Sequence, residues 1–276
     1  MKLYLAGIKS YQLDLGIECS EFTDPGLERR IQGIKRDHGE PDRRTRTPLT
    51  RPYLLQILSR LRVHNYENTV LQAAFTLAFA GFLRVGEFTY KGADMEMGPA
   101  FAKWFLTKKS VRIKGEGTHM ELSLSSSKTD PFRKGITITI AASHDSACPV
   151  RAIKRFLASD THRPVHSPLF CIRKYKQLPF TREYVMNQLQ ELARGAGFGD
   201  GSWNGHSFRR GAATWAAEVG IPETDIPTLG RWRSDAYKAY IEYSAEDQIS
   251  LSSRFQAPQN PLPRGSQACL NTGTRR

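Results

Sequence analysis

The segment from Gly205 to Tyr243, which reads GHSFRRGAATWAAEVGIPETDIPTLGRWRSDAYKAYIEY, combines imidazole, guanidinium and phenol side chains at short spacing. His206 and Arg209 stand three positions apart, which places them on one face of a helix. A group of tyrosines closes the segment. Guanidinium groups bind phosphate oxygens through paired hydrogen bonds, and a phenol can attack phosphorus. These residue types therefore indicate chemistry on a phosphodiester.

Two cations further upstream could complete such a site. Arg84, in GFLRVGEF, follows a strongly apolar run, and we expect Glu87 to hold and aim its side chain. Lys128, in SSSKTDPFRKG, lies between two strand-like segments, so it would project from the tip of a hairpin. Taken singly, both have ordinary interpretations, as a helix-terminal arginine and a loop lysine. Arg133 and Lys134 could serve equally well for plain phosphate contact.

Together these side chains suit cleavage by a tyrosine nucleophile. Ionising a free tyrosine at pH 7 costs about 4 kcal/mol, and neighbouring guanidinium groups with a histidine acceptor reduce that cost. A lysine can protonate the leaving oxygen as a general acid. Because the arginines supply the positive charge, we expect no metal and no other cofactor. The histidines and cysteines between His144 and Cys171 fit no compact zinc pattern.

The composition points to a polyanionic partner. The 276 residues include 40 Lys+Arg against 27 Asp+Glu, a net charge of +13, which favours nucleic acid. Residues 29–51 hold eight basic and three acidic residues, and this run is interpreted equally well as a solvated hinge or as a basic strap along phosphates. The candidate DNA-contacting residues are Arg43, Arg44, Arg46, Arg51, Arg133, Lys134 and Arg210.

Targeting to a membrane or to an oxidising compartment is not expected. The apolar run from Val70 to Leu83 is too short to cross a bilayer, and charged residues interrupt the N-terminal segment. The four cysteines lie scattered without paired spacing, which is typical of a reducing compartment.

The periodicities predict a mostly α fold with a small antiparallel β-sheet (α+β). Helices are expected over 2–15, 25–36, 53–61, 68–83, 149–158 and 183–195, and over much of the remainder to about residue 254. Strands are expected over 102–106, 110–114, 121–125 and 135–141. This gives a partial helical arm domain (1–38), a basic linker (39–52), a catalytic domain (53–254) and a disordered tail (255–276).

The ordered motifs resemble those of the tyrosine recombinases, the phage-integrase type of site-specific recombinase. The resemblance spans about residues 1–250 and is carried by FLRVGEF, SKTDPFR, HSFRRG, LGRW and DAYKAYI. Their wording is most similar to the recombinases of eukaryotic mobile elements, the Crypton and DIRS-like groups. The resemblance implies double-stranded DNA as partner, a tetramer on paired sites and a nuclear location.

The same resemblance implies a role for each motif residue. Arg84 and Arg209 would hold the scissile phosphate, His206 would act as acid and base, and Lys128 would be the general acid. Trp232 would buttress the site and donate a hydrogen bond from its indole N–H. Tyr240 would attack and form a 3′-phosphotyrosyl link.

Two features depart from the family pattern. Trp232 and Tyr240 are eight positions apart, one fewer than in the best-known members, so Tyr237 and Tyr243 stay open as nucleophiles beside the favoured Tyr240. Only the last two helices of the family's four-helix arm domain fit into residues 1–38, which predicts a truncated or reduced clamp on DNA.

Two other functions remain open. A DNA-binding module without catalysis, the remnant of a mobile element, would use residues 216–232 as a helix-turn-helix with Gly220 at the turn. A relaxing topoisomerase would use the same phosphotyrosine chemistry.

Overall fold

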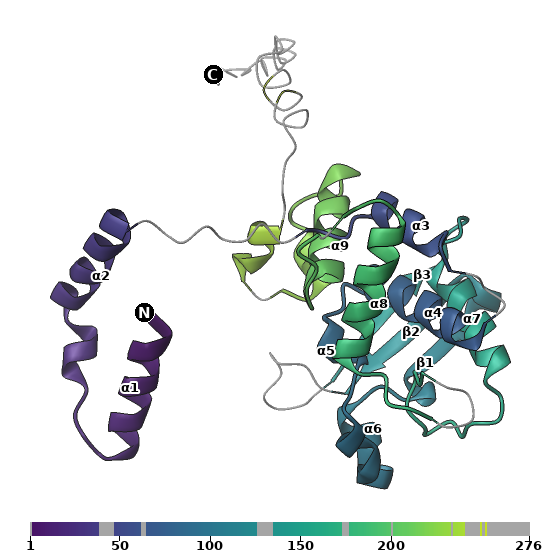
Figure 1. Cartoon of the computed structure of the whole chain (residues 1–276), viewed down its shortest axis with the longest axis horizontal. Coiled ribbons are helices and arrows are strands. Elements are labelled where there is room, and N and C mark those ends of the chain that lie inside the picture. Colours follow the sequence, from purple (N-terminus) through teal and green to yellow (C-terminus); the bar gives the residue numbers. More distant parts are fainter. Residues whose placement is uncertain are drawn as a thin grey trace, which may run out of the picture. The chain divides into compact units, whose positions relative to one another are not determined.

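The computed structural model describes residues 2–38, 47–61, 65–125, 135–172, 177–199, 201–232, 234–240, 249 and 252. The chain divides into two compact units, Met1–Arg46 and Thr47–Arg276 (Figure 1). The proposed linker 39–52 straddles this division, and of the proposed tail no residue is described.

The first unit is a pair of helices. Helix α1 (Lys2–Asp14) ends before Gly16, which has a positive φ of 71°. A short 3₁₀ helix, η1 (Ser20–Thr23), leads to α2 (Pro25–His38), where the Asp24 carboxylate accepts the N–H of Gly26 at 2.8 Å. Both helices were predicted. Among the described residues of this unit only Cys19 is buried, so the unit has almost no core of its own.

The second unit is mostly helical with one small sheet, as the periodicities predict. Its longer helices are α3 (Arg51–Leu58), α4 (Tyr66–Ala80), α7 (Pro149–Ser159), α8 (Arg182–Gly195) and α9 (Ser207–Glu218). Shorter helical turns are α5 (Val85–Phe88), α6 (Phe101–Trp104), α10 (Ile226–Gly230) and the 3₁₀ helices η2 (Gly92–Ala100), η3 (Lys108–Ser110), η4 (Gly115–Gly117) and η5 (Asp235–Tyr240). Within the described residues no helix has the length and apolar character needed to span a membrane.

The sheet has three antiparallel strands in the order β1 (Val111–Lys114), β2 (His119–Leu124) and β3 (Ile136–Ala141). Alternate residues of β2 are buried, and the register pairs Met120 with Ile140 on the same face. The opposite face carries Glu121 and Ser123, the latter opposite Thr137. Lys128, which was predicted at the tip of a hairpin, lies in the connection between β2 and β3, where residues 126–134 are outside the described residues.

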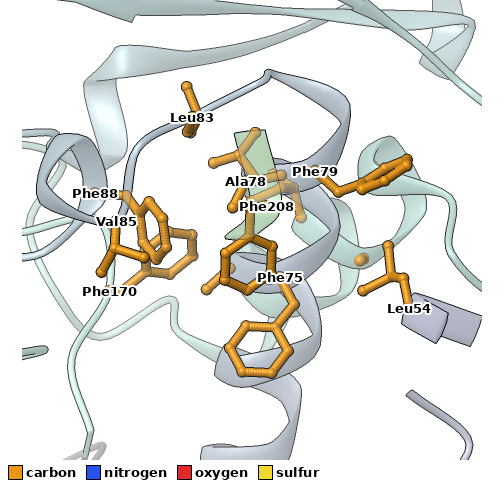
Figure 2. Close-up of a cluster of buried hydrophobic side chains, with 14 of the residues drawn as sticks. Leu54, Phe75, Ala78, Phe79, Leu83, Val85, Phe88, Phe170 and Phe208 are labelled. Carbon is orange, nitrogen blue, oxygen red and sulfur yellow. The ribbon is translucent and has the colours of Figure 1, made fainter. Parts of the chain in front are cut away.

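Helix α4 is the centre of the hydrophobic core, because it is buried from Thr69 to Phe79. It packs against α7 and α9, and its Phe75 ring meets Phe208 of α9 with ring centroids 5.2 Å apart (Figure 2). Phe88 of α5 contacts the same Phe208 ring edge-on at 6.2 Å. The two turns that carry Arg84 and His206 are therefore fixed to one aromatic core.

The strand expected over 102–106 is wrong, because α6 occupies most of this segment. Phe101 and Phe105 are one helical turn apart, their rings stack at 4.9 Å, and the Phe105 N–H donates to the Phe101 carbonyl at 2.9 Å. Tyr90 meets Phe101 edge-on at 5.1 Å. The spacing of four residues between the two phenylalanines fits an alternating strand, but in the structure they form a helical i, i+4 pair.

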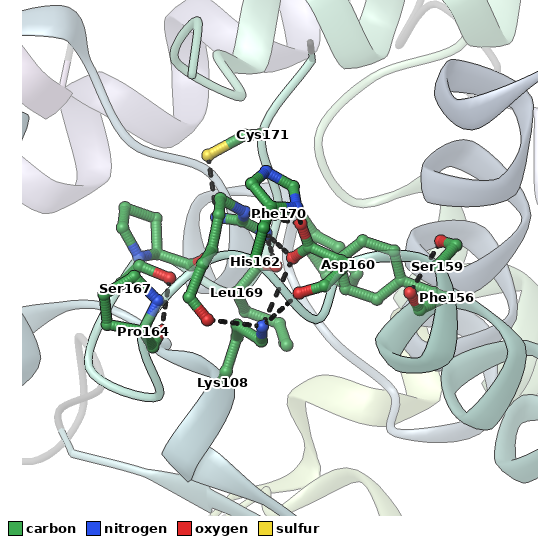
Figure 3. A network of polar contacts seen from close by, with 12 residues as sticks. Lys108, Phe156, Ser159, Asp160, His162, Pro164, Ser167, Leu169, Phe170 and Cys171 are labelled. Carbon is green, nitrogen blue, oxygen red and sulfur yellow. Dashed lines mark hydrogen bonds and ion pairs between the residues drawn. The ribbon is translucent and has the colours of Figure 1, made fainter. Parts of the chain in front are cut away.

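A buried polar network fixes the loop between α7 and α8 (Figure 3). Arg163 pairs with Asp160, both of them buried, and also donates to the carbonyl of Pro168 at 2.7 Å and to the thiol of Cys171 at 3.0 Å. Lys108 closes the network through the carbonyl of Arg163 at 2.9 Å. The loop presents the Phe170 ring to Phe88 of α5, so the network supports the turn that carries Arg84.

Candidate active site

The turn after α4 places Arg84 and Glu87 side by side. Gly81 ends α4, Phe82 takes a left-handed backbone conformation with φ 50°, and Arg84 begins α5. The Glu87 carboxylate accepts the Arg84 backbone N–H at 2.9 Å and the Arg84 Nη1 at 3.0 Å. The Arg84 side chain is 24% exposed, so it is both held by Glu87 and accessible to a ligand.

A second turn carries His206 and is tied directly to the first. The Val85 N–H donates to the Gly205 carbonyl at 3.0 Å, which joins the residue after Arg84 to the residue before His206. The Asn204 side chain accepts the His206 N–H at 2.8 Å, and α9 begins at Ser207. The imidazole is therefore set at the start of α9 by hydrogen bonds on its backbone.

Arg209, one turn into α9, is a buried cation at the centre of the cluster. Its side chain is 1% exposed, its Nη1 donates to the Phe82 carbonyl at 2.8 Å, and its guanidinium stacks 4.1 Å from the Trp232 ring centroid. Burial, followed by the nearby charge of Arg84, lowers the pKa of Arg209 to about 10. Its Nε is buried and has no hydrogen-bond partner among the described residues.

The closing segment brings Tyr240 to the same place. The Tyr240 hydroxyl lies 3.4 Å from His206 Nδ1, and the two rings are stacked with centroids 6.3 Å apart. Thr214 of α9 donates to the Tyr240 carbonyl at 2.6 Å, which fastens the end of η5 to α9. The guanidinium of Arg210 lies 5.3 Å from the Tyr240 ring.

The other aromatic residues near Tyr240 do not contact the His206 imidazole in the described contacts. Tyr237 is buried and packs on Trp232, with centroids 6.1 Å apart. Trp232 also meets Phe82 and Tyr240, so its described contacts are ring contacts and the stacking on Arg209, with no indole hydrogen bond among them. Tyr243 lies outside the described residues.

Arg231 is a site residue that the sequence does not single out. Its guanidinium donates to the Gly81 carbonyl at 2.7 Å and to the Glu87 carboxylate at 3.3 Å. Burial lowers the pKa of Arg231, the Glu87 charge opposes that effect and the Arg84 charge adds to it. The only available signal is its place directly before Trp232 in LGRW.

Most of the candidate DNA-contacting residues cannot be placed. Arg51 is described, and its guanidinium is bound by Asp145 at 2.7 Å and by Ser143 at 3.2 Å. All of these bonds use Nη2 of Arg51, whose side chain is 21% exposed. The DNA-contacting candidates outside the described residues are Arg43, Arg44, Arg46, Arg133 and Lys134, and the predicted general acid Lys128 also lies outside them.

The assembled groups suit a phosphodiester. Among the described residues, Arg84, Arg209 and Arg231 face one carboxylate, Glu87, so this cluster carries an excess of positive charge that an anion would neutralise. Arg209 retains an unused buried N–H, a donor that is costly to leave unpaired. A phenol hydroxyl beside an imidazole nitrogen is the arrangement of a nucleophile with its proton acceptor.

Comparison with known proteins identifies the fold. No family model matches the chain, and no curated protein does. Among solved structures, XerA recombinase has a TM-score of 0.52 and 15% identity, over 80% of this chain and 68% of XerA. XerH site-specific recombinase bound to palindromic difH substrate has a TM-score of 0.53 and 15% identity, over 76% of this chain and 53% of XerH. The Tn1549 transposon integrase, in complex with a circular intermediate DNA, has a TM-score of 0.53 and 13% identity, over 91% of this chain and 76% of that chain.

At identities of 13% to 15%, these similarities show the fold alone. The mostly helical second unit with its three-stranded antiparallel sheet accordingly has the fold of the tyrosine recombinase catalytic domain.

Proposed function

We propose that this protein is a site-specific DNA recombinase or integrase that cleaves and rejoins strands through a 3′-phosphotyrosine intermediate. The observation that carries the proposal is the position of the Tyr240 hydroxyl, 3.4 Å from His206 Nδ1. It lies in the same cluster as Arg84 and the buried Arg209, whose Nε–H has no acceptor among the described residues. Catalytic hydrogen bonds that are long in a ligand-free site shorten when the substrate binds.

In the cleavage step the Tyr240 oxygen attacks the scissile phosphorus while the bond from phosphorus to the 5′ oxygen breaks. The phenol proton passes to His206, and the departing 5′ oxygen receives a proton from a general acid. Arg84 and Arg209 stabilise the negative charge that builds on the non-bridging oxygens. Rejoining is the reverse reaction, with a 5′ hydroxyl from the same or another duplex as the nucleophile.

Lys128 is proposed as the general acid, and Trp232 as the residue that holds Arg209 in place. The support for Lys128 is its place in the chain between β2 and β3. The support for Trp232 is the 4.1 Å stacking of the Arg209 guanidinium on its ring.

Double-stranded DNA is the proposed partner, with four copies acting on two paired sites. The net charge of +13 supports a polyanion, and XerH is described as bound to its difH substrate. We further propose that the protein acts in the nucleus as part of a eukaryotic mobile element, on the wording of its motifs alone.

The test is covalent trapping on DNA. A library of labelled, nicked duplexes with randomised flanks is incubated with the protein, and a protein–DNA adduct is sought under denaturing conditions. Wild type should form the adduct. Tyr240→Phe should form none, because phenylalanine has no oxygen to attack phosphorus.

Tyr237→Phe is the matched control, because it removes a hydroxyl three residues away and keeps the packed ring. It should form the adduct as wild type does. An adduct of undiminished yield with Tyr240→Phe would refute Tyr240 as nucleophile.

A DNA-binding module without catalysis is the rival function. It predicts a band shift that weakens with salt and no adduct from any variant. A recognition helix in the region 216–232 finds little support, since α10 after Gly220 has five residues.

A further inference from the structure

Arg231 occupies a strained and largely buried position beside the candidate active site. It ends α10 with φ 59°, in the left-handed region that glycine adopts more easily, and its side chain is 12% exposed. Its guanidinium reaches back across the fold to the turn between α4 and α5. Nη1 donates to the Gly81 carbonyl at 2.7 Å, and Nη2 approaches the Phe82 carbonyl at 3.4 Å and Glu87 at 3.3 Å.

The groups that Arg231 contacts are the ones that hold the two phosphate-binding arginines. Glu87, which is 8% exposed, binds Arg84 through one carboxylate oxygen, while its other oxygen accepts the Arg84 backbone N–H and contacts Arg231. The Phe82 carbonyl accepts from Arg209 and is shared with Arg231. Arg231 therefore contacts both Glu87, which binds Arg84, and the Phe82 carbonyl, which accepts a hydrogen bond from Arg209.

Arg231 is also covalently next to the segment that carries the nucleophile. Trp232 follows it directly, the Trp232 N–H donates to the Pro227 carbonyl at 2.9 Å, and Tyr240 lies at the end of η5. Fixing Arg231 to the α4–α5 turn thus sets the distance between the Tyr240 segment and the phosphate-binding arginines.

Stability alone does not explain this arrangement. Burying an ion pair is costly, and replacing one by apolar residues of similar volume is often neutral or stabilising. A non-glycine residue in the left-handed region adds backbone strain. Both the buried ion pair and the backbone strain are explained if the site requires a positive charge at a fixed position.

We propose that Arg231 is a positioning residue for DNA cleavage, which locks the α4–α5 turn and shares Glu87 with Arg84 so that the phosphate-binding arginines keep their charge and direction. This inference rests on the proposed function. With three guanidiniums and one carboxylate the cluster carries a net charge of +2, which matches the two negative charges that can develop on a pentavalent phosphorane.

The charge balance distinguishes this role from a purely structural one. Arg231→Met reduces the cluster to +1, because Glu87 then neutralises Arg84 alone. Adding Glu87→Gln removes that carboxylate and restores +2. A double variant that is faster than Arg231→Met follows from a charge role, whereas two lost structural contacts would make the double variant slower.

The experiment compares wild type, Arg231→Met, Arg231→Lys, Glu87→Gln and the double variant in single-turnover adduct formation at saturating protein. DNA affinity and thermal unfolding are measured for each. Arg231→Met should slow adduct formation about 100-fold with little change in affinity, and Arg231→Lys should lie between it and wild type. The double variant should recover about tenfold of the loss.

Arg60→Met, at an exposed position after α3, is the control and should react as wild type does. Adduct formation by Arg231→Met at the wild-type rate, or a double variant slower than Arg231→Met, would overturn the inference and leave the proposed function standing.

Hydrogen exchange in the absence of DNA tests the positioning independently of cleavage. Arg231→Met should speed exchange at the amides of residues 83–88 and 232–240, and Arg60→Met should not. If wild type forms no adduct at all, the proposed function fails, and the exchange data still decide whether Arg231 couples the two segments. Unchanged exchange in Arg231→Met would refute the coupling.

Discussion

Arg209 is the side chain on which the proposed chemistry depends most. It is almost completely buried, it donates to one backbone carbonyl, and it leaves its Nε–H unused among the described residues. A buried cation with a spare donor is costly in the absence of a ligand. A phosphodiester bound at the proposed site would supply the counter-charge.

Trp232→Ala should weaken both the fold and the reaction, because the indole covers Arg209. We expect a loss of about 3 kcal/mol in the free energy of unfolding, of which about 1 kcal/mol belongs to the cation–π contact. Trp232→Phe should lose less, since a smaller ring can still stack on the guanidinium. Urea denaturation and adduct yield measure the two effects, and equal stability of wild type and Trp232→Ala would contradict the stacking role.

The sequence predicts which residues lie at the site better than it predicts the contacts between them. The spacing of His206 and Arg209, with Glu87 beside Arg84, is short-range information, so it can be recognised in the chain itself. The role of Arg231 could not be predicted, because its partners Gly81 and Glu87 are more than a hundred residues away. The stacking of Trp232 on Arg209 depends on the same long-range packing.

At the scale of elements, the close approach between α9 and the segment before α3 sets the position of His206. The Leu49 N–H donates to the Ser207 carbonyl at 3.1 Å. The Leu49 backbone also fills the space where a Cβ on Gly211 would lie. Only glycine allows this approach, so Gly211 keeps α9 seated beneath the site.

Gly211→Ala should destabilise the protein by about 2 kcal/mol or more, because the added methyl group would overlap backbone atoms that cannot move freely. Gly195→Ala is the matched control. It lies at the end of α8 with open space around its Cα and should be neutral or slightly stabilising. The measurement is the midpoint of thermal unfolding, and similar midpoints for the two variants would refute the close approach.

The longer helices and the three strands of the described residues follow from local patterns, whereas the short helical turns between α4 and β2 were not predicted. The apolar run of α4 and the alternating Ile-Thr sequence of β3 were predicted close to their observed limits, since both patterns can be recognised in the chain itself. The segment 102–106 was predicted as a strand. In a run this short a stacked Phe101–Phe105 pair and an alternating strand look alike.

At the scale of the whole molecule, the net charge of +13 favours binding to a polyanion such as DNA. The interior of the second unit also contains buried polar groups that contribute to its stability. Tyr90 is one of these groups, with its hydroxyl 2.7 Å from the Phe170 carbonyl and 3.3 Å from the Cys171 sulfur. Burial, reinforced by Cys171, raises the pKa of Tyr90 above its usual range. The pKa of Tyr66 is also raised, chiefly by burial.

Stability should therefore fall at alkaline pH. A tyrosine whose pKa is raised on folding contributes stability that is complete below about pH 10 and is lost as the pH rises towards the folded-state pKa. Tyr90→Phe should cost about 1 kcal/mol at pH 8 through the lost hydrogen bond, and this deficit should vanish at about pH 10.6 and reverse by about pH 11.5, because only wild type keeps a buried hydroxyl from ionising. Urea midpoints across this range measure it, and a constant deficit would contradict the assignment.

The fold class could be predicted from the sequence, because motif order and periodicity both favour a helical domain with a small sheet. The chemistry could be predicted only as a set of candidates. Whether Tyr237, Tyr240 or Tyr243 attacks depends on how η5 lies against α9, and that position is set by the contact between Thr214 and the Tyr240 backbone.

The most direct measurement is the site of covalent attachment to DNA. After trapping on a nicked duplex, nuclease and trypsin digestion should leave the nucleotide on a peptide of this segment. Cleavage after Arg233, Lys238 and Arg254 separates SDAYK from AYIEYSAEDQISLSSR, and fragmentation of the second peptide distinguishes Tyr240 from Tyr243. We predict a nucleotide on Tyr240. A nucleotide on either other tyrosine, or no modified peptide from an active preparation, would contradict the proposed mechanism.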